Sequence, residues 1–251
     1  MSVDQRLFDF FPENVSVDLD WQKKEIRIKH LLAMSAGLKW NDWGPDIWDW
    51  VTSLDWGESA LQLPQQDYPG NVFNYNSSLS HLLSIILEKS TKISTLEFAD
   101  QHLFKPLGIR QRHWDNDPQG YYTGGFGLSL TARDLAKLGF LYLNNGYWDG
   151  QSIVSEQWVQ ASTRHRWYAH RVYGPTGYGY QWWVDDDGYY LALGYMGQFI
   201  FVVPRRDIVA VDQEAQVRDV RVFRIEHDRV RAPGRVEGVA PLAAARVGRD
   251  D

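Results

Sequence analysis

The triplet Tyr75-Asn76-Ser77 brings a phenol, an amide and a hydroxyl together immediately before an apolar helical pattern. A phenol at such a loop-to-helix junction can face a cleft and pass a proton to or from a reacting group. A tyrosine that only packs at the start of a helix produces the same local pattern. The triplet is therefore a candidate catalytic site whose meaning depends on the motifs around it.

The helix that would position this triplet covers residues 77–89. Its apolar stripe recurs at the spacing of one helix face, at Leu79, Leu82, Leu83 and Ile86. Asn76 or Ser77 can cap the N terminus with a side-chain oxygen, and Lys89 suits the negative C-terminal end of the helix dipole. We expect Tyr75 to lie at the mouth of this helix.

Three further segments accompany the triplet in order along the chain, at residues 26–38, 124–139 and 194–198. In this order and spacing the four segments resemble the serine β-lactamase and penicillin-binding-protein superfamily. The resemblance covers about residues 1–212. It is nearest to the class C-like branch, which contains esterases, D-amino-acid peptidases and 6-aminohexanoate-oligomer hydrolases. Each segment alone is a weak signal, but the ordered set is fairly specific.

Three motifs build the site in this superfamily. A Ser-x-x-Lys supplies the nucleophile and its base, a Tyr-x-Asn supplies a phenol and an amide, and a Lys- or His-Thr/Ser-Gly strand closes the far wall. The second motif matches here as Tyr75-Asn76-Ser77, with serine in the asparagine place. The third matches as Tyr195-Met196-Gly197, with only the glycine kept. The resemblance implies Tyr75 as the catalytic phenol and Ser77 as a substrate-binding hydroxyl.

The resemblance also implies the far wall of the site. The backbone N–H of Gln198 would donate to the oxyanion, and Gly197 would let the substrate approach the strand closely. The expected cleft residues are Tyr121, Tyr122, Tyr195 and Met196. Because Tyr195 replaces a cation and Met196 replaces a hydroxyl, neutral esters or short amides are favoured over penicillin-like anions as substrates.

The Ser-x-x-Lys motif is absent, because no serine in this chain is followed three places later by a lysine. In the superfamily it lies a few tens of residues before the segment matched by His30-Leu31-Leu32, which here falls at or before Met1. We therefore expect an N-terminally truncated serine hydrolase of ester or amide bonds, inactive as this fragment. The alternative is a non-catalytic ligand-binding protein on the same scaffold.

Ser35 offers a rival nucleophile, in the segment Ala33-Met34-Ser35-Ala36-Gly37. A nucleophile elbow needs a buried strand before the serine and a helix after it. The residues before Ser35 have a helical pattern, and Gly37 ends that element. His30, at the start of the same helix, is expected to be a structural histidine.

The resemblance implies an α+β, β-lactamase/transpeptidase-like fold. It has a helical region and an antiparallel sheet flanked by helices, with the sheet incomplete here. Strand patterns occupy residues 178–184, 189–193, 198–203 and 208–211. From about Gln213 the composition changes, with no Trp, Tyr or Lys. We divide the chain into a domain at 1–212, lacking its N-terminal strands and Ser-x-x-Lys helix, and an atypical tail at 213–251. A divergent final strand and helix is the alternative for the tail.

Composition limits the partners. A net charge of −6 argues against a nucleic-acid partner, and no run of eighteen apolar residues exists that could span a membrane. The chain has no cysteine, and nothing in it implies a cofactor or a metal. Residues 1–20 lack the pattern of a signal peptide, which leaves the compartment open. The expected partner is a small-molecule ester or amide. Five of the twelve tryptophans fall within residues 40–56, where they line an apolar cleft or pack their own core.

Overall fold

The computed structural model describes residues 1–16, 19–169, 175–212 and 221–224. Its α-helices are α1 (Ile28–Leu32), α2 (Pro45–Val51), α3 (Trp56–Gln62), α4 (Ser77–Thr91), α5 (Thr95–Ala99), α6 (Ala132–Leu143) and α7 (Glu156–Ser162). Its strands are β1 (Arg112–Trp114), β2 (Leu128–Leu130), β3 (Tyr147–Trp148), β4 (Gln151–Ser152), β5 (Trp167–Tyr168), β6 (Gly177–Tyr178), β7 (Trp183–Val184), β8 (Tyr190–Leu193), β9 (Phe199–Val203), β10 (Ile208–Asp212) and β11 (Arg221–Arg224).

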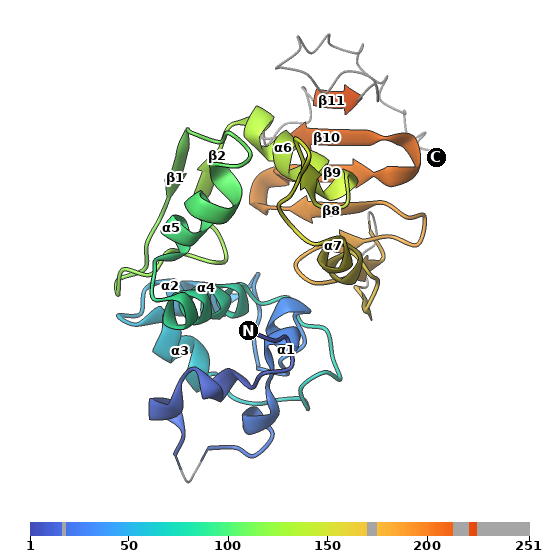
Figure 1. Ribbon diagram of the computed structural model, residues 1–251. Helices are drawn as coiled ribbons and strands as arrows, with labels where there is room; N and C mark the ends of the chain where they lie inside the picture. The colour runs from blue at the N-terminus through green and yellow to red at the C-terminus, as the bar shows by residue number, and fades with distance from the viewer. Residues whose placement is uncertain (17–18, 170–174, 213–220, 225–251) are drawn as a thin grey trace, which may run out of the picture.

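Short 3-10 helices occur at η1 (Leu7–Asp9), η2 (Pro12–Asn14), η3 (Lys23–Glu25), η5 (Tyr195–Gly197) and η6 (Pro204–Arg206), and η4 (Asp100–Phe104) is a π-helix. A helical region lies on one side of the molecule and a sheet covered by α6 on the other (Figure 1). This mixture of helices and an antiparallel sheet confirms the α+β fold class.

The main sheet has seven strands in the order β11-β10-β9-β8-β7-β6-β5, and every neighbouring pair is antiparallel. Burial alternates along β9, so that Ile200 and Val202 face the core while their neighbours are half-buried. The three strands β8, β9 and β10 confirm the strand patterns predicted at 189–193, 198–203 and 208–211.

Helix α6 covers one face of this sheet (Figure 1). Thr131 caps its N terminus by accepting the backbone N–H of Asp134 at 3.2 Å. The helix approaches the sheet closely at Gly139, where a Cβ would lie 2.6 Å from Cγ1 of Val209 and 2.7 Å from Cγ2 of Ile200. A glycine at this position lets the helix backbone rest directly on β9 and β10.

Helix α4 forms the centre of the helical region. Its apolar face packs into the largest buried cluster, together with α1, α3 and the N-terminal segment. The buried residues that α4 contributes to this cluster are Leu79, Leu82, Ile85 and Ile86. Lys89 lies in the last turn of α4, as predicted, and its Nζ donates to the carbonyl of Phe10 at 3.0 Å and to Glu13 at 2.6 Å. The predicted helix at 77–89 is therefore confirmed.

The segment 178–184, predicted as one strand, forms two. β6 and β7 pair with each other across a tight reversal at residues 179–182. Gln181 has a φ of +61°, its N–H donates to the carbonyl of Leu32 at 3.0 Å, and its side chain accepts from Ser80 at 3.0 Å. These contacts with α1 and α4 stabilise the reversal, and they join the sheet to the helical region.

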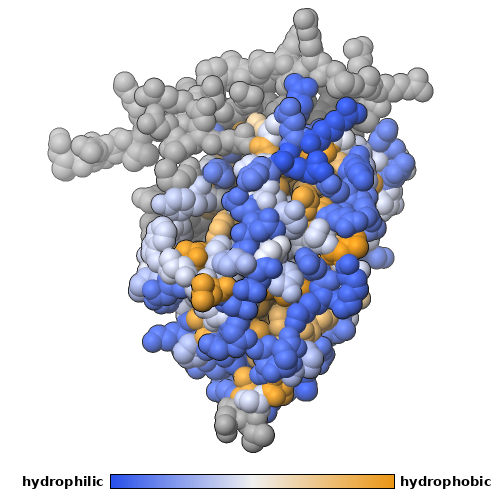
Figure 2. Space-filling model, turned by 90° about the vertical axis from the view of Figure 1, so that its left-hand side faces the viewer, coloured by the Kyte–Doolittle hydropathy of each residue, from blue (hydrophilic) through white to orange (hydrophobic). Residues whose placement is uncertain are grey.

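Four residues of the predicted tail, 221–224, form β11 beside β10. The rest of the tail, at 213–220 and 225–251, lies outside the described residues, so the domain boundary at 212 and the non-native character of the tail stay predictions. The helices of the described residues all lack the length and hydropathy that a bilayer crossing requires. One face of the molecule is mainly hydrophilic, with hydrophobic residues in separate small patches (Figure 2).

Candidate functional site

The N terminus of α4 is capped by Asn76, one of the two residues, with Ser77, that the sequence offered as caps. Its side-chain oxygen accepts the backbone N–H of Ser78 at 2.9 Å and the hydroxyl of Ser78 at 2.6 Å. Asn76 itself has extended backbone angles, with φ −148° and ψ 108°. This geometry fixes Tyr75 as the last residue of the loop that enters the helix.

Tyr75 is half-buried where the helical region meets the sheet. Its ring stacks on Trp183 of β7, with centroids 5.6 Å apart and planes at 16°, and meets the ring of Tyr178 edge-on at 6.1 Å. Tyr178 is fully buried, and burial raises its pKa well above the usual value, with a further contribution from Tyr75. The candidate phenol is thus held by aromatic contacts with β6 and β7, and β7 is the strand that pairs with β8.

Ser77 is bound by a carboxylate that the sequence reading missed. Its backbone N–H donates to Oδ1 of Asp42 at 2.8 Å, and its hydroxyl donates to Oδ2 at 3.1 Å. Oδ1 also accepts Nε1–H of Trp40 at 2.8 Å. Because the Ser77 hydroxyl proton is directed at Asp42, the serine presents its lone pairs to any other partner. Asp42 lies in the tryptophan-rich loop, and no local pattern marks it as a partner of Ser77.

An exposed aromatic pair connects the two matched motifs. Trp43 follows Asp42 and is 77 % exposed, while Tyr195 in η5 is 75 % exposed. Their ring centroids lie 6.3 Å apart. The loop that binds Ser77 through Asp42 therefore also contacts, through Trp43, the turn that carries Tyr195, Met196 and Gly197.

Gly197 occupies a backbone conformation that favours glycine, with a φ of +85°. It ends η5, and the turn around it is closed by the N–H of Gly194, which donates to the carbonyl of Gln198 at 2.7 Å. Both Gly197 and Gln198 are exposed. The backbone N–H of Gln198 as an oxyanion donor stays a prediction, as does the contribution of Met196 to the cleft.

Tyr121 and Tyr122 lie beside the middle of α4 and not at its N terminus. The carbonyl of Tyr122 accepts the hydroxyl of Ser84 at 2.6 Å, and the N–H of Tyr121 donates to Asp117 at 2.8 Å. Burial raises the pKa of Tyr121, and the Glu88 carboxylate further along α4 adds to the shift. The contacts of these two tyrosines are with the middle of α4 and with Asp117, and their part in the cleft stays an untested prediction.

Ser35 does not have the setting of a nucleophile elbow. It follows helix α1, it is 2 % exposed, and its N–H donates to the carbonyl of His30 at 2.8 Å. His30 has a structural role, as expected, because its Nδ1 accepts the N–H of Arg27 at 3.1 Å. Burial lowers the pKa of His30 to about 4.

Residues 1–211 match the protein-family model described as Beta-lactamase. This chain belongs to the Beta-lactamase family. It is 29 % identical over 151 residues to a 6-aminohexanoate-dimer hydrolase from Paenarthrobacter ureafaciens. The aligned region covers 55 % of this chain and 38 % of that protein. This chain is 27 % identical over 183 residues to a protein of unassigned function from Alkalihalophilus pseudofirmus, which covers 60 % and 54 % of the two chains. The chain thus spans between 38 % and 54 % of the length of these curated relatives.

Solved structures share the fold of this Beta-lactamase family member. A candidate 6-aminohexanoate-dimer hydrolase from Bacillus anthracis superimposes with a TM-score of 0.71 at 19 % identity, covering 86 % of this chain and 61 % of that one. EstCE1, a hydrolase with promiscuous acyltransferase activity, gives 0.67 at 19 % identity, covering 86 % and 73 %. A penicillin-binding protein homologue from Caulobacter crescentus gives 0.60 at 18 % identity, covering 82 % and 68 %. The resemblance to this superfamily, proposed from the motifs, is confirmed.

Proposed function

We propose that this chain carries one wall of a serine hydrolase site that cleaves an uncharged ester or amide through an acyl-enzyme. The observation that carries the proposal is the contact between Trp43, next to the Asp42 that binds Ser77, and Tyr195 of the glycine-bearing turn. This contact supports a shared site for the two matched motifs within a Beta-lactamase family fold. Tyr75 would be the phenol that transfers protons in this site.

The chemistry requires a serine hydroxyl from a Ser-x-x-Lys motif, which no position in these 251 residues provides. That oxygen attacks the substrate carbonyl while the neutral amine of the lysine takes its proton, and the Tyr75 phenol relays a proton from the lysine to the leaving group. The oxyanion takes hydrogen bonds from the nucleophile's own N–H and from Gln198. The leaving group departs with a proton, and water then cleaves the acyl ester to regenerate the serine.

Charge around Ser77 favours an uncharged substrate. The Asp42 carboxylate is negative and lies within hydrogen-bond distance of the Ser77 side chain. The resemblance aligns Tyr195 with the lysine or histidine of the superfamily motif, so this site lacks a cation there that would attract a substrate carboxylate. Trp43 and Tyr195 offer exposed aromatic surface for an apolar part of the substrate. These features support neutral esters or short amides over penicillin-like anions.

The 251-residue chain itself should have negligible activity, because loss of a serine nucleophile costs on the order of 10⁶-fold in kcat in a well-studied serine hydrolase. Incubation with a fluorophosphonate, followed by intact-mass analysis, should show no adduct. A reproducible adduct on this chain would mean that a different nucleophile acts, and the proposed roles would be wrong.

The decisive test uses a reading frame that extends the coding sequence upstream of Met1. We expect it to encode a Ser-x-x-Lys and to give a protein that fluorophosphonate labels and that hydrolyses a neutral p-nitrophenyl ester. Tyr75→Phe should lower kcat by roughly 10²–10⁴-fold. Tyr168→Phe, an exposed tyrosine of β5, is the matched control and should leave kcat unchanged. Lack of labelling would favour the non-catalytic ligand-binding alternative, and full activity of Tyr75→Phe would remove the phenol from the mechanism.

A further inference from the structure

His81 and Asp117 form a buried polar pair, and His81 lies one helical turn after Ser77 in α4. Nε2 of His81, in α4, lies 3.0 Å from Oδ2 of Asp117, in the segment 117–125, and both side chains have no exposed surface. The rings of Trp50 and Trp56 meet the imidazole edge-on, with centroids 5.7 and 5.5 Å away. Two titratable groups buried this completely need a defined pattern of donors and acceptors.

One tautomer of His81 satisfies the neighbouring groups. Oδ1 of Asp117 already accepts the N–H groups of Gln119 at 2.9 Å and Tyr121 at 2.8 Å, so Oδ2 is the acceptor that meets Nε2. On the other side of the ring, Nδ1 faces the N–H of Gly124 at 3.4 Å. A proton on Nε2 and a lone pair on Nδ1 give each of these contacts one donor and one acceptor.

A second proton would break this arrangement, because a protonated Nδ1 would face the N–H of Gly124, donor against donor. Burial lowers the pKa of His81, while Asp117 in the loop and Asp55 before α3 act in the opposite direction. Trp50 and Trp56, which pack on the ring, carry no charge. The neutral ring is therefore the form that fits the cavity.

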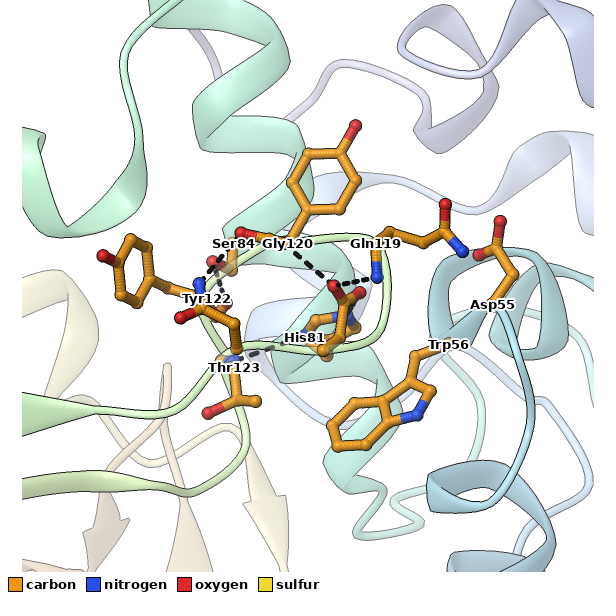
Figure 3. A network of polar contacts seen from close by, with 12 residues as sticks. Asp55, Trp56, His81, Ser84, Gln119, Gly120, Tyr122 and Thr123 are labelled. Carbon is orange, nitrogen blue, oxygen red and sulfur yellow. Dashed lines mark hydrogen bonds and ion pairs between the residues drawn. The ribbon is translucent and has the colours of Figure 1, made fainter.

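The segment held by this pair runs along α4 from its middle to its first turn, and Figure 3 shows Gln119, Gly120, Tyr122 and Thr123 of this segment beside His81 and Ser84. A Cβ on Gly124 would lie 2.0 Å from the carbonyl oxygen of Ser80. A Cβ on Gly125 would lie 2.8 Å from the carbonyl oxygen of Ser77 and 3.2 Å from its Cβ. Residues 77 and 81 are one helical turn apart, so the contact at His81 and the contact at Ser77 lie on one helix face.

We propose that His81, as the neutral Nε2–H tautomer, is a positioning residue that seats the segment 117–125 on α4 and so holds Gly125 against Ser77. Only one part of this proposal rests on the proposed function, namely that Ser77 belongs to a substrate site. His81 acts on Ser77 through Gly124 and Gly125 and does not itself contact the substrate.

The tautomer of His81 tests the proposal in the full 251-residue chain, by ¹⁵N NMR of the imidazole nitrogens, assigned by the loss of signal in His81→Gln. We expect a protonated Nε2 and an unprotonated Nδ1, unchanged between about pH 5.5 and 8. An Nδ1–H tautomer, or titration of this ring near its ordinary pKa, would overturn the proposal. The measurement needs no turnover, so failure of the hydrolase assignment would leave it intact.

Amide hydrogen exchange tests the positioning itself. His81→Leu should lower the protection factors of the Gly124 and Gly125 amides by about tenfold or more and shift the amide resonance of Ser77. His81→Gln, whose carboxamide can donate to Asp117, should restore much of the protection. His113→Leu, an exposed histidine of β1, is the control and should change neither readout. Unchanged protection in a folded His81→Leu variant would refute the positioning role, and the tautomer measurement on the wild type decides if that variant does not fold.

Discussion

Asp42 is the residue that ties the tryptophan-rich loop to the candidate site. Its two carboxylate oxygens receive the backbone N–H and hydroxyl of Ser77 and the indole N–H of Trp40. The N–H of Ser77 is one of the donors left free at the start of α4, so Asp42 caps this helix from a distant part of the chain. One side chain therefore supports the helix, the loop and the placement of Trp43 together.

Asp42→Ala should lower the free energy of unfolding by about 1–3 kcal/mol, because it leaves three donors without their acceptor. Urea denaturation followed by circular dichroism measures this change. Asp49→Ala removes a carboxylate from the exposed side of α2 and should have an effect within about 0.5 kcal/mol of zero. Equal effects of the two substitutions would show that the contacts of Asp42 contribute nothing to stability.

His30 makes stability depend on pH. Its pKa is about 4 in the folded chain, against about 6.5 for an unfolded histidine. Between these values the unfolded chain binds a proton that the folded chain does not, so stability is lost as the pH falls from 6.5 towards 4. Because solvent screens the partly exposed ring of His30, its loss should stay below about 3 kcal/mol, and burial of His81 acts in the same direction.

Urea titrations at a series of pH values measure this loss, and His30→Gln should reduce it. His113→Gln, at an exposed position, should leave the pH dependence as in the wild type. An unaltered pH profile in His30→Gln would show that this histidine is not the source of the dependence.

Sequence patterns predicted the local features of single residues better than their distant partners. A cap at Asn76 or Ser77 followed from polar residues placed before an apolar stripe, and the structure selects Asn76. The partners of Ser77 and His81 lie 35 and 36 residues away, and local spacing contains no information about such pairs. The position of Tyr121 and Tyr122 beside the middle of α4 was not predictable for the same reason.

The elements show which interactions override local preference. The run from Tyr178 to Val184 is rich in aromatic residues, so it favours one strand. The folded chain instead reverses at 179–182, where Gln181 bonds to α1 and α4. A Cβ on Gly179 would lie 2.1 Å from the carbonyl oxygen of Ser162, so the reversal also packs directly on α7. The local sequence pattern that predicts a strand contains no information about tertiary contacts of this kind.

Gly139→Ala tests the packing of α6 on the sheet, because a gain and a loss of stability have opposite meanings. Helix propensity alone would stabilise the alanine variant by about 1 kcal/mol. The added Cβ would meet side chains of β9 and β10 at 2.6–2.7 Å, so we expect a net loss of about 1–3 kcal/mol instead. Thermal unfolding by calorimetry gives the sign. A gain in stability would mean that α6 does not lie this close to the sheet.

At the scale of the whole molecule, the candidate site depends on how the helical region meets the sheet. Tyr75 stacks on Trp183, Ser80 bonds to Gln181, and Trp43 touches Tyr195, so three contacts from different segments cross this boundary. The order of the motifs predicted the family and the fold, and it placed Tyr75 at a helix mouth. It did not predict that the loop at residues 40–43 joins the two motifs.

Proximity of the two motifs is the central claim, and a chain without native cysteine allows it to be measured directly. Trp43→Cys combined with Tyr195→Cys should be joined by a short bismaleimide in native buffer and not in urea, as read by intact mass and tryptic peptides. The pair Trp43→Cys and Tyr168→Cys is the control, because β5 lies three strands from β8, roughly 14 Å across the sheet. Efficient linking of the first pair alone is the predicted result. No link in the first pair, or equal linking of both, would contradict a site shared by the start of α4 and the glycine-bearing turn.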